Sequence, residues 1–340
     1  MSQKIFILGA NGFIGNSLVA DILAKTDWQI TGLDLTSHQL EASIGHPRFN
    51  FKQANMLEEK IWIDEQIKQC DVVLPLAAIA TPATYVSDPL RIFELDFEAN
   101  LAIVRQCVKH QKRVIFPSTS EVYGMCPDEE FDEEVSNLVT GPIHKERWIY
   151  SCSKQMMDRI IYAYGARNQL RYTLFRPFNW MGPKLDNILN PKPGSSRVLT
   201  QFIGNILRGE NINLVDGGKN TRSFTDIDDG ISALIKIIEN KNHCADQRIF
   251  NIGNPDNILS IRSLAELLVS MIKTYPKYAE LAQKTKLIEI SGKDYFGAGY
   301  QDIPHRVPSI KHAKEILNWA PVVDTQTSLK KTLDYHLGGA

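Results

Sequence analysis

Three glycines near the start of the chain restrict its fold more than any other feature of the sequence. The segment Gly9-Ala-Asn-Gly12-Phe-Ile-Gly15 lies between an apolar strand-like run, Lys4–Leu8, and a helical pattern over Phe13–Lys25. A glycine turn between a strand and a helix lets backbone amides and the helix N-terminus approach a pyrophosphate. The second predicted strand is followed by Asp34, whose carboxylate can accept hydrogen bonds from ribose hydroxyls. This order predicts a dinucleotide-binding unit. The alternative is that the glycines only form a turn and Asp34 only caps the next segment.

Short apolar strands alternate with helical patterns through the first half of the chain, which is typical of a parallel sheet with helices on both faces. Their continuous apolarity agrees with burial on two sides. In the helical pattern after the glycine turn, Ile14, Leu18 and Ile22 recur every four residues and form one apolar face. Besides Lys4–Leu8, the predicted strands are Gln29–Leu33, Asp71–Leu76, Arg113–Pro117 and Arg171–Arg176.

After about Phe178 the pattern becomes less regular, with a Pro/Gly/Ser-rich stretch at Pro191–Ser196. Helical patterns follow at Val198–Arg208 and Ile261–Thr274. Between them, helix and strand patterns like those of the first half return at Phe224–Asn240 and Arg248–Ile252.

We therefore expect an α/β fold, a doubly wound parallel Rossmann sheet with a second, smaller α+β substrate lobe. The expected NAD-binding domain comprises residues 1–178 with returns near 223–254. The expected substrate-binding lobe comprises residues 179–222 and 255–340.

The acid after the second strand favours NAD over NADP. A 2′-phosphate would meet the carboxylate of Asp34, and the adjacent Leu35 supplies no positive charge. The 38 basic and 39 acidic side chains leave a formal net charge of -1, which gives no general field for nucleic acid or an anionic membrane. We expect NAD as the cofactor. The candidate cofactor-binding residues are Gly9, Gly12, Phe13, Ile14, Gly15, Asp34, Asn55, Met56, Leu76, Ala77 and Lys154.

Tyr150 and Lys154 form a candidate proton-transfer pair. They lie in a helical pattern over Trp148–Tyr164, where a spacing of four residues puts both side chains on one face. A neighbouring ammonium favours the phenolate, so Tyr150 can take the proton of a hydroxyl while a hydride leaves for nicotinamide. Alone, such a pair is more often a surface Tyr and Lys, but here it follows a complete dinucleotide fingerprint.

A second candidate group follows a predicted strand at its C-terminal end, where doubly wound sheets place their sites. The hydroxyl of Thr119 or Ser120 can share a substrate hydroxyl with Tyr150. Glu121 is a stronger signal, because a carboxylate beside hydride-transfer residues is costly unless it acts as a base or pairs with a cation. The alternative is a solvated loop acid.

The chain resembles the extended short-chain dehydrogenase/reductase family, in which the glycine spacing GxxGxxG precedes a Tyr-x-x-x-Lys pair. More closely, it resembles the UDP-glucuronate dehydrogenase/decarboxylase half of the bifunctional polymyxin-resistance enzymes that make aminoarabinose for lipid A. The similarity runs along nearly the whole chain, and without a formyltransferase portion we expect a free-standing version. The segments that carry it are Pro75–Pro82, Phe93–Phe97, Phe116–Met125, Arg176–Pro183 and Asp216–Lys219.

The resemblance implies NAD-dependent oxidative decarboxylation of UDP-glucuronic acid to a UDP-4-keto-pentose. It implies catalytic roles for Tyr150, Lys154, Ser120, Glu121 and Arg306, with Glu121 as the acid/base carboxylate and Arg306 as its paired arginine. Oxidation at C4 creates a ketone β to the C5 carboxylate, so loss of carbon dioxide needs little more than positioning. The substrate-binding residues it implies are Ala80, Tyr85, Thr119, Ser120, Arg147, Asn179, Arg197, Arg222 and Tyr300.

Two positions depart from the family pattern. Asn213 stands where the relative has a lysine, which puts one substrate contact in doubt. Asn55 stands where the family usually places an Asp that holds adenine, although its carbonyl can still accept from the adenine amino group.

Other functions remain open at this point. A UDP-xylose synthase would use the same residue types and reduce the ketone again with NADH. A UDP-apiose synthase has cysteines where this chain has Ala80 and Ser120, and the 4,6-dehydratases carry an Asp-Glu pair where this chain has Ser120 and Glu121. Other nucleotide-sugar epimerases are more distant. A non-catalytic NAD-binding protein is disfavoured, because Tyr150, Lys154 and Glu121 are all present.

The remaining features suggest a cytoplasmic protein without a metal. The five scattered cysteines lack a CxxC pair, the histidines show no ligand spacing, and the N-terminus lacks a signal-peptide pattern. The longest uncharged stretch, Val72–Val86, is too short to span a membrane. We expect a small-molecule UDP-sugar as the partner, no nucleic acid or membrane, and by the resemblance a homodimer or higher homo-oligomer.

Overall fold

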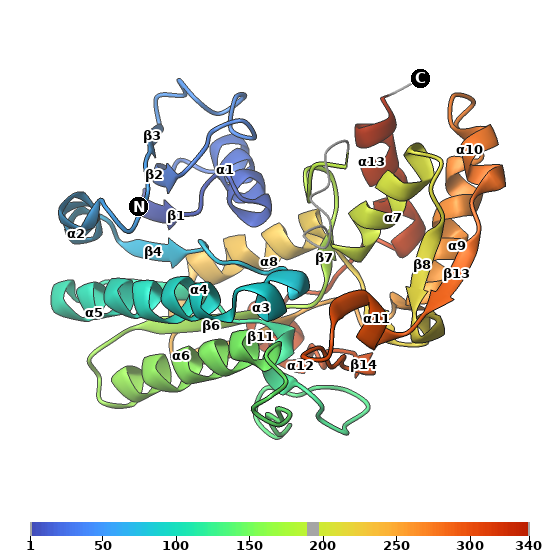
Figure 1. Cartoon of the computed structure of the whole chain (residues 1–340). Helices are drawn as coiled ribbons and strands as arrows, with labels where there is room; N and C mark the ends of the chain where they lie inside the picture. The colour runs from blue at the N-terminus through green and yellow to red at the C-terminus, as the bar shows by residue number, and fades with distance from the viewer. Residues whose placement is uncertain (1, 189–196, 339–340) are drawn as a thin grey trace.

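The computed structural model describes residues 2–188 and 197–338 (Figure 1). The Pro/Gly/Ser-rich stretch Pro191–Ser196 lies outside the described residues. No helix in the described ranges is both long and apolar enough to cross a membrane.

A seven-stranded parallel sheet forms the centre of the protein, in the order β3-β2-β1-β4-β5-β6-β11. The chain runs outward from β1 through β2 and β3, then returns to β4 on the other side of β1. The doubly wound Rossmann class predicted from the sequence is thus confirmed. The strands are β1 (Lys4–Leu8), β2 (Gln29–Asp34), β3 (Phe49–Gln53), β4 (Val72–Pro75), β5 (Arg113–Pro117), β6 (Tyr172–Pro177) and β11 (Arg248–Ile252).

Helices cover both faces of this sheet, and the side chains of β1 alternate between the two cores that result. Ile5 and Ile7 pack into one core, whereas Phe6 and Leu8 pack into the other. The first core also receives α1 (Phe13–Lys25), α8 (Ile227–Glu239) and α12 (Lys311–Leu317). The second core also receives α2 (Lys60–Gln69), α5 (Asn100–His110) and α6 (Trp148–Ala166). Burial on both faces explains why these strands are apolar at consecutive positions.

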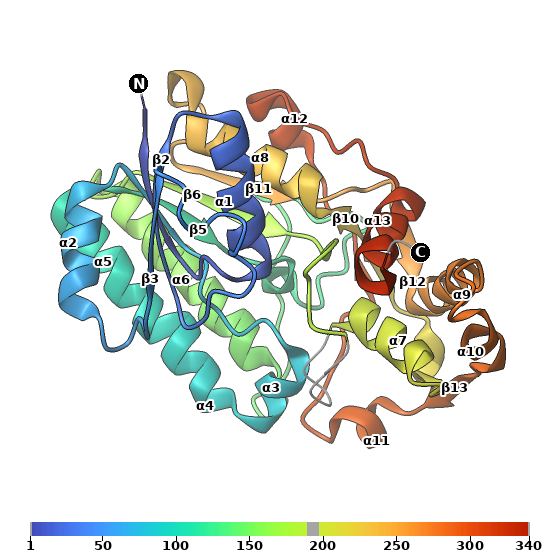
Figure 2. The ribbon, with the colours of Figure 1, turned by 90° about the horizontal axis from the view of Figure 1, so that it is seen from above.

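A second group of elements lies beside the C-terminal edge of the sheet, on the right in Figure 1 and Figure 2. Its own apolar core includes Phe202, Leu264, Leu268 and Leu333. The helices around that core are α7 (Val198–Leu207), α9 (Ile261–Ile272), α10 (Ala279–Lys284) and α13 (Thr325–Leu337). Short strands pair here as β8 (Ile212–Val215) with β13 (Leu287–Ile290), and as β9 (Thr221–Ser223) with both β12 (Ile258–Ser260) and β14 (His305–Arg306).

Shorter elements complete the structure. Strands β7 (Trp180–Met181) and β10 (Thr225–Asp226) pair with each other and contact both α8 of the sheet group and α13 of the second group. The others are α3 (Pro82–Ser87), α4 (Pro89–Ile92), the π-helix η1 (Phe93–Ala99), the 3₁₀ helices η2 (Ser120–Tyr123), η3 (Asp216–Gly218) and η4 (Lys241–His243), and α11 (Gly292–Phe296).

The turn between β1 and α1 leaves no room for a side chain at Gly15. A Cβ atom there would lie 2.3 Å from the Gly9 carbonyl oxygen and 2.8 Å from the Ala10 carbonyl oxygen, both fixed backbone atoms. At Gly12 the corresponding Cβ would lie 3.3 Å from the Gly9 oxygen.

We therefore predict that Gly15→Ala forces the turn apart and lowers the free energy of unfolding by about 3 kcal/mol, at the upper end of overpacking costs. Gly12→Ala is the matched control and should cost much less. Urea unfolding of both variants measures the difference, and equal stability of the two would contradict this description of the turn.

Candidate active site

A cavity of 420 Å³ opens at the C-terminal ends of the central strands. This is where open α/β sheets place ligands, next to the point at which the strand order reverses between β1 and β4. Every catalytic and substrate-binding residue predicted from the sequence lines it. So do the predicted cofactor-binding residues Gly9, Gly12, Phe13, Ile14, Gly15, Leu76 and Lys154.

Four predicted cofactor-binding residues lie outside the lining of this cavity, three of them at the C-terminal ends of β2 and β3. Asp34 ends β2 and pairs in register with Gln53 at the end of β3, while Asn55 and Met56 follow directly. Ala77 contacts the glycine turn instead, since its backbone nitrogen would lie 2.7 Å from a Cβ at Gly9.

The glycine turn fits a dinucleotide. Backbone fills the space around Gly9 and Gly15, and no side chain in the described part of the chain caps the N-terminus of α1 at Gly12, so its amides stay available for a phosphate. The Asp34 carboxylate accepts a hydrogen bond of 2.8 Å from the backbone N–H of Asn11. Burial raises the pKa of Asp34, and this backbone contact opposes the rise.

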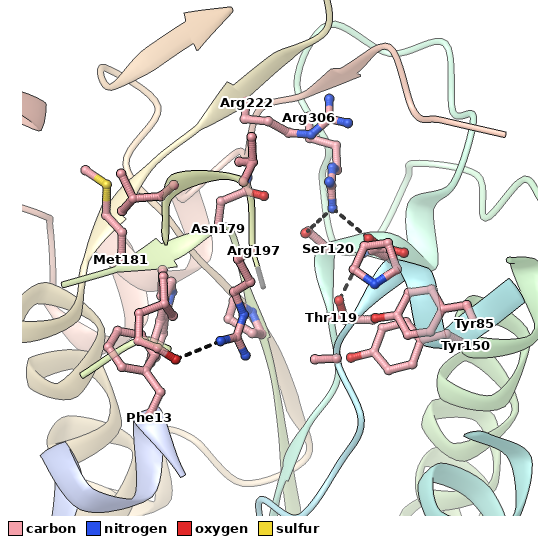
Figure 3. A pocket seen from close by; sticks show the side chains of 18 of the residues that line it. Phe13, Tyr85, Thr119, Ser120, Tyr150, Asn179, Met181, Arg197, Arg222 and Arg306 are labelled. Atoms are coloured by element: carbon pink, nitrogen blue, oxygen red, sulfur yellow. Dashed lines mark hydrogen bonds and ion pairs between the residues drawn. The ribbon is translucent and has the colours of Figure 1, made fainter. Parts of the chain in front are cut away.

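Tyr150 and Lys154 lie one turn apart on α6, as their spacing predicts. The Tyr150 ring stacks on that of Tyr85, with centroids 4.6 Å apart and the planes inclined by 8° (Figure 3). Lys154 Nζ lies 5.9 Å from the centre of the Tyr150 ring and donates a hydrogen bond of 3.1 Å to the Pro117 carbonyl. Burial, followed by the charges of Asp96 and Glu121, raises the pKa of Tyr150.

Glu121 is buried between two arginines from distant parts of the chain. Arg147, just before α6, donates to Oε2 at 3.2 Å, and Arg306 of β14 donates to Oε1 at 3.2 Å. Arg306 also reaches Ser120 Oγ at 3.5 Å, and Figure 3 shows its side chain extending toward this loop. A solvated loop acid, the alternative considered for Glu121, does not describe this residue, which is 7% exposed.

A model of the NAD dependent epimerase/dehydratase family matches residues 5–253 of the chain. The chain belongs to this family.

Solved structures agree with this family assignment. The PbgP3 protein from Burkholderia pseudomallei is 51% identical, with a TM-score of 0.91 over 99% of this chain and 97% of that one. UDP-glucuronic acid 4-epimerase from Bacillus cereus is 21% identical, with a TM-score of 0.80 over 99% of this chain and 100% of that one. A dTDP-glucose 4,6-dehydratase from Bacillus anthracis is 19% identical, with a TM-score of 0.78 over 99% and 97%. The protein is therefore an enzyme of the NAD-dependent epimerase/dehydratase type.

Sequence reasoning missed Asp302, which lines the cavity of this epimerase/dehydratase family member. Its carboxylate accepts from Arg222 Nη2 at 2.8 Å and from Asn220 at 2.6 Å. Burial alone would raise the pKa of Asp302, but Arg222, Arg147 and Arg306 outweigh burial and lower that pKa to about 2. Burial and the Arg222 charge in turn lower the pKa of Arg306 to about 10.

Sequence reasoning also missed Asp158 of α6, which contacts residues next to the site. Asp158 accepts from Ser118 at 2.7 Å and from Arg176 at 3.1 Å, and so ties the loop after β5 to α6. The signal was available, because Asp158 lies four residues beyond Lys154 on the same helix face.

We predict that Asp302→Asn destabilises the protein in a pH-dependent way. The folded-state pKa of about 2 lies below the ordinary value of 3.8, so the stabilisation is present above about pH 4 and is lost as the pH falls through 2. The variant should lose about 2 kcal/mol at neutral pH and about half of that near pH 3. Urea unfolding at both pH values measures this, with the exposed Asp27→Asn as the control. If the difference in unfolding free energy between Asp302→Asn and the wild type does not change with pH, the ion-pair explanation is contradicted.

Proposed function

We propose that the protein catalyses NAD-dependent oxidative decarboxylation of UDP-glucuronic acid, giving a UDP-4-keto-pentose, carbon dioxide and NADH. The observation that carries the proposal is the buried Glu121 carboxylate held between Arg147 and Arg306, in the same cavity as Tyr150 and Lys154. The resemblance to the polymyxin-resistance decarboxylases supports it. The Bacillus cereus epimerase, which has the same fold, was crystallised with UDP-glucuronic acid and NAD together.

The arginines around Glu121 suit an anionic sugar. Arg147, Arg222 and Arg306 are buried beside two acids, the buried Glu121 and the partly exposed Asp302, so this cluster carries one excess positive charge. Arg147 Nε and Nη1 and Arg306 Nε have no hydrogen-bond partner among the described residues. A buried guanidinium with unused N–H donors favours a planar carboxylate that accepts two hydrogen bonds. A glucuronate C5 carboxylate has that geometry, whereas a neutral hexose does not.

Tyr150 is the candidate base for the first step. In its phenolate form it would take the proton of the sugar C4 hydroxyl, with Lys154 stabilising that phenolate and Ser120 or Thr119 orienting the substrate. Bound NAD supplies the hydride acceptor. The stacked Tyr85 ring fixes the Tyr150 ring, so little conformational freedom is lost when the substrate binds.

Glu121 and Arg306 serve the second step. The C4 ketone lies β to the C5 carboxylate, so breaking the C5–carboxylate bond releases carbon dioxide and leaves an enolate that the ketone stabilises. Arg306 orients the carboxylate, and Glu121 handles the proton that quenches the enolate at C5. Because both groups are buried, their electrostatic effect on the developing charge is screened little by water.

The cavity also offers residues for the nucleotide. Asn179, Arg197, Arg222 and Tyr300 line it, and we propose that they hold the UDP portion. Asn213, which stands where the relative has a lysine, also lines the cavity. At this position the substrate would therefore meet a polar but uncharged side chain.

The division into a cofactor-binding and a substrate-binding part, with the sequence boundaries given above, belongs to the same proposal. So does the homodimer or higher homo-oligomer, which sedimentation of the purified protein tests directly.

The reaction itself predicts a product ratio. With UDP-glucuronic acid and excess NAD, the protein should form one NADH for each UDP-4-keto-pentose, measured by absorbance and by NMR of the sugar nucleotide. UDP-xylose without NADH would indicate a closed-cycle synthase. A hexuronate epimer would indicate an epimerase. Either product would overturn the proposal that the UDP-4-keto-pentose is released together with NADH.

We further predict that Glu121→Gln and Arg306→Ala each lower kcat at least about a hundredfold, as expected for loss of a positioned proton-transfer group. NAD affinity should persist in both variants, because neither side chain belongs to the glycine turn. The exposed Glu130→Gln serves as a charge-matched control and should keep full activity. Near-normal turnover in both site variants would refute these roles.

A further inference from the structure

A buried aspartate contacts Lys154 of the proton-transfer pair. Asp96 is fully buried, and its Oδ1 lies 3.4 Å from Lys154 Nζ in an ion pair. It sits in the π-helix η1, which packs along α6. Such π-helical turns recur at functional sites, because the extra residue in the turn redirects side chains.

The second oxygen of the same carboxylate holds a neighbouring loop. Asp96 Oδ2 accepts a hydrogen bond of 3.0 Å from the backbone N–H of Ile79. One turn later, Asn100 donates to the carbonyls of Leu95, at 2.9 Å, and Ala77, at 3.4 Å. The loop from Leu76 to Ala80, which follows β4 and lines the cavity, is therefore fixed by two side chains of one continuous helix.

The charges around Tyr150 come from several elements. Lys154 on its own helix is positive, as is Arg197 across the cavity, whereas Asp96 of η1 and Glu121 of η2 are negative. Tyr85 of α3 stacks on the ring, and Asp158 on α6 acts on Lys154 from the next turn. Burial raises the pKa of Asp96, and the Lys154 charge opposes that rise. An unpaired ammonium at the position of Lys154 would be strongly unfavourable.

We propose that Asp96 is a positioning residue for the Tyr150–Lys154 pair. Its carboxylate binds both Lys154 and the Leu76–Ala80 loop and so fixes their relative positions. Its negative charge balances the buried Lys154 ammonium, so that Tyr150 stays protonated in the resting enzyme. The proposal rests on the proposed function only for the role of Tyr150 as the base.

The first test needs no substrate. Asp96→Asn keeps the size of the side chain and the acceptor for Ile79 but removes the charge. In NAD-saturated protein labelled with ¹³Cζ tyrosine, the Tyr150 resonance is assigned by its loss in Tyr150→Phe. Without the Asp96 charge, the phenolate should form at a pH lower by about one unit than in the wild type. Identical resonance positions at every pH at which both proteins stay folded, or ionisation at a higher pH, would overturn the proposal.

Asn100→Ala is the matched control, because it removes a side chain that fixes the loop and leaves the charge in place. It should weaken NAD binding by about fivefold, the effect of losing one hydrogen bond, without moving the Tyr150 ionisation. If Asn100→Ala shifts that ionisation as much as Asp96→Asn does, the effect is structural and the charge balance is refuted.

Turnover provides the second test. If UDP-glucuronic acid is the substrate, the acid limb of the kcat profile should move down by about one pH unit in Asp96→Asn, with KM little changed. If the wild type does not turn over this sugar, the proposed function fails, and the resonance experiment still decides the role of Asp96.

Discussion

Burial of the Glu121 carboxylate between two arginines is the constraint on which the rest of the site depends. A charge removed from water is tolerated only when its partners are close and correctly placed. Glu121 follows β5, Arg147 precedes α6, and Arg306 comes from a strand near the C-terminus. The ion pairs therefore require the central sheet and the C-terminal segment to meet at one place, which is the cavity where the chemistry is proposed.

The smaller group of elements brings its arginines to the site through a short strand pairing. Strand β14 lies beside β9 in parallel register, with Arg306 opposite Arg222. Two cations side by side would repel each other, and Asp302 offsets that repulsion with a hydrogen bond to Arg222. The cluster keeps one excess positive charge facing the cavity, which favours a sugar that carries a carboxylate over a neutral sugar.

The fold could be predicted from the sequence because its signals are local. The glycine turn and the helical pattern after it predicted the bounds of α1 correctly. The apolar runs predicted β1 and β5 at their observed residues, since burial on both faces leaves a continuous apolar pattern. Tyr150 and Lys154 were also local, four residues apart on one helix. Arg306 was identified only by resemblance, because a lone arginine in a loop gives no sign of the carboxylate that it meets 185 residues away. Asp96 and Asp302 were missed for the same reason, because their partners, Lys154 and Arg222, are distant in the sequence and only the tertiary structure brings them near.

The most direct test of the central claim is a crystal structure of the protein with UDP-glucuronic acid and NAD, in the Glu121→Gln variant to slow turnover. The account predicts that the C5 carboxylate lies within hydrogen-bond distance of Arg306 or Arg147, with the C4 hydroxyl on Tyr150. A sugar bound with its carboxylate turned away from both arginines, toward solvent, would contradict it.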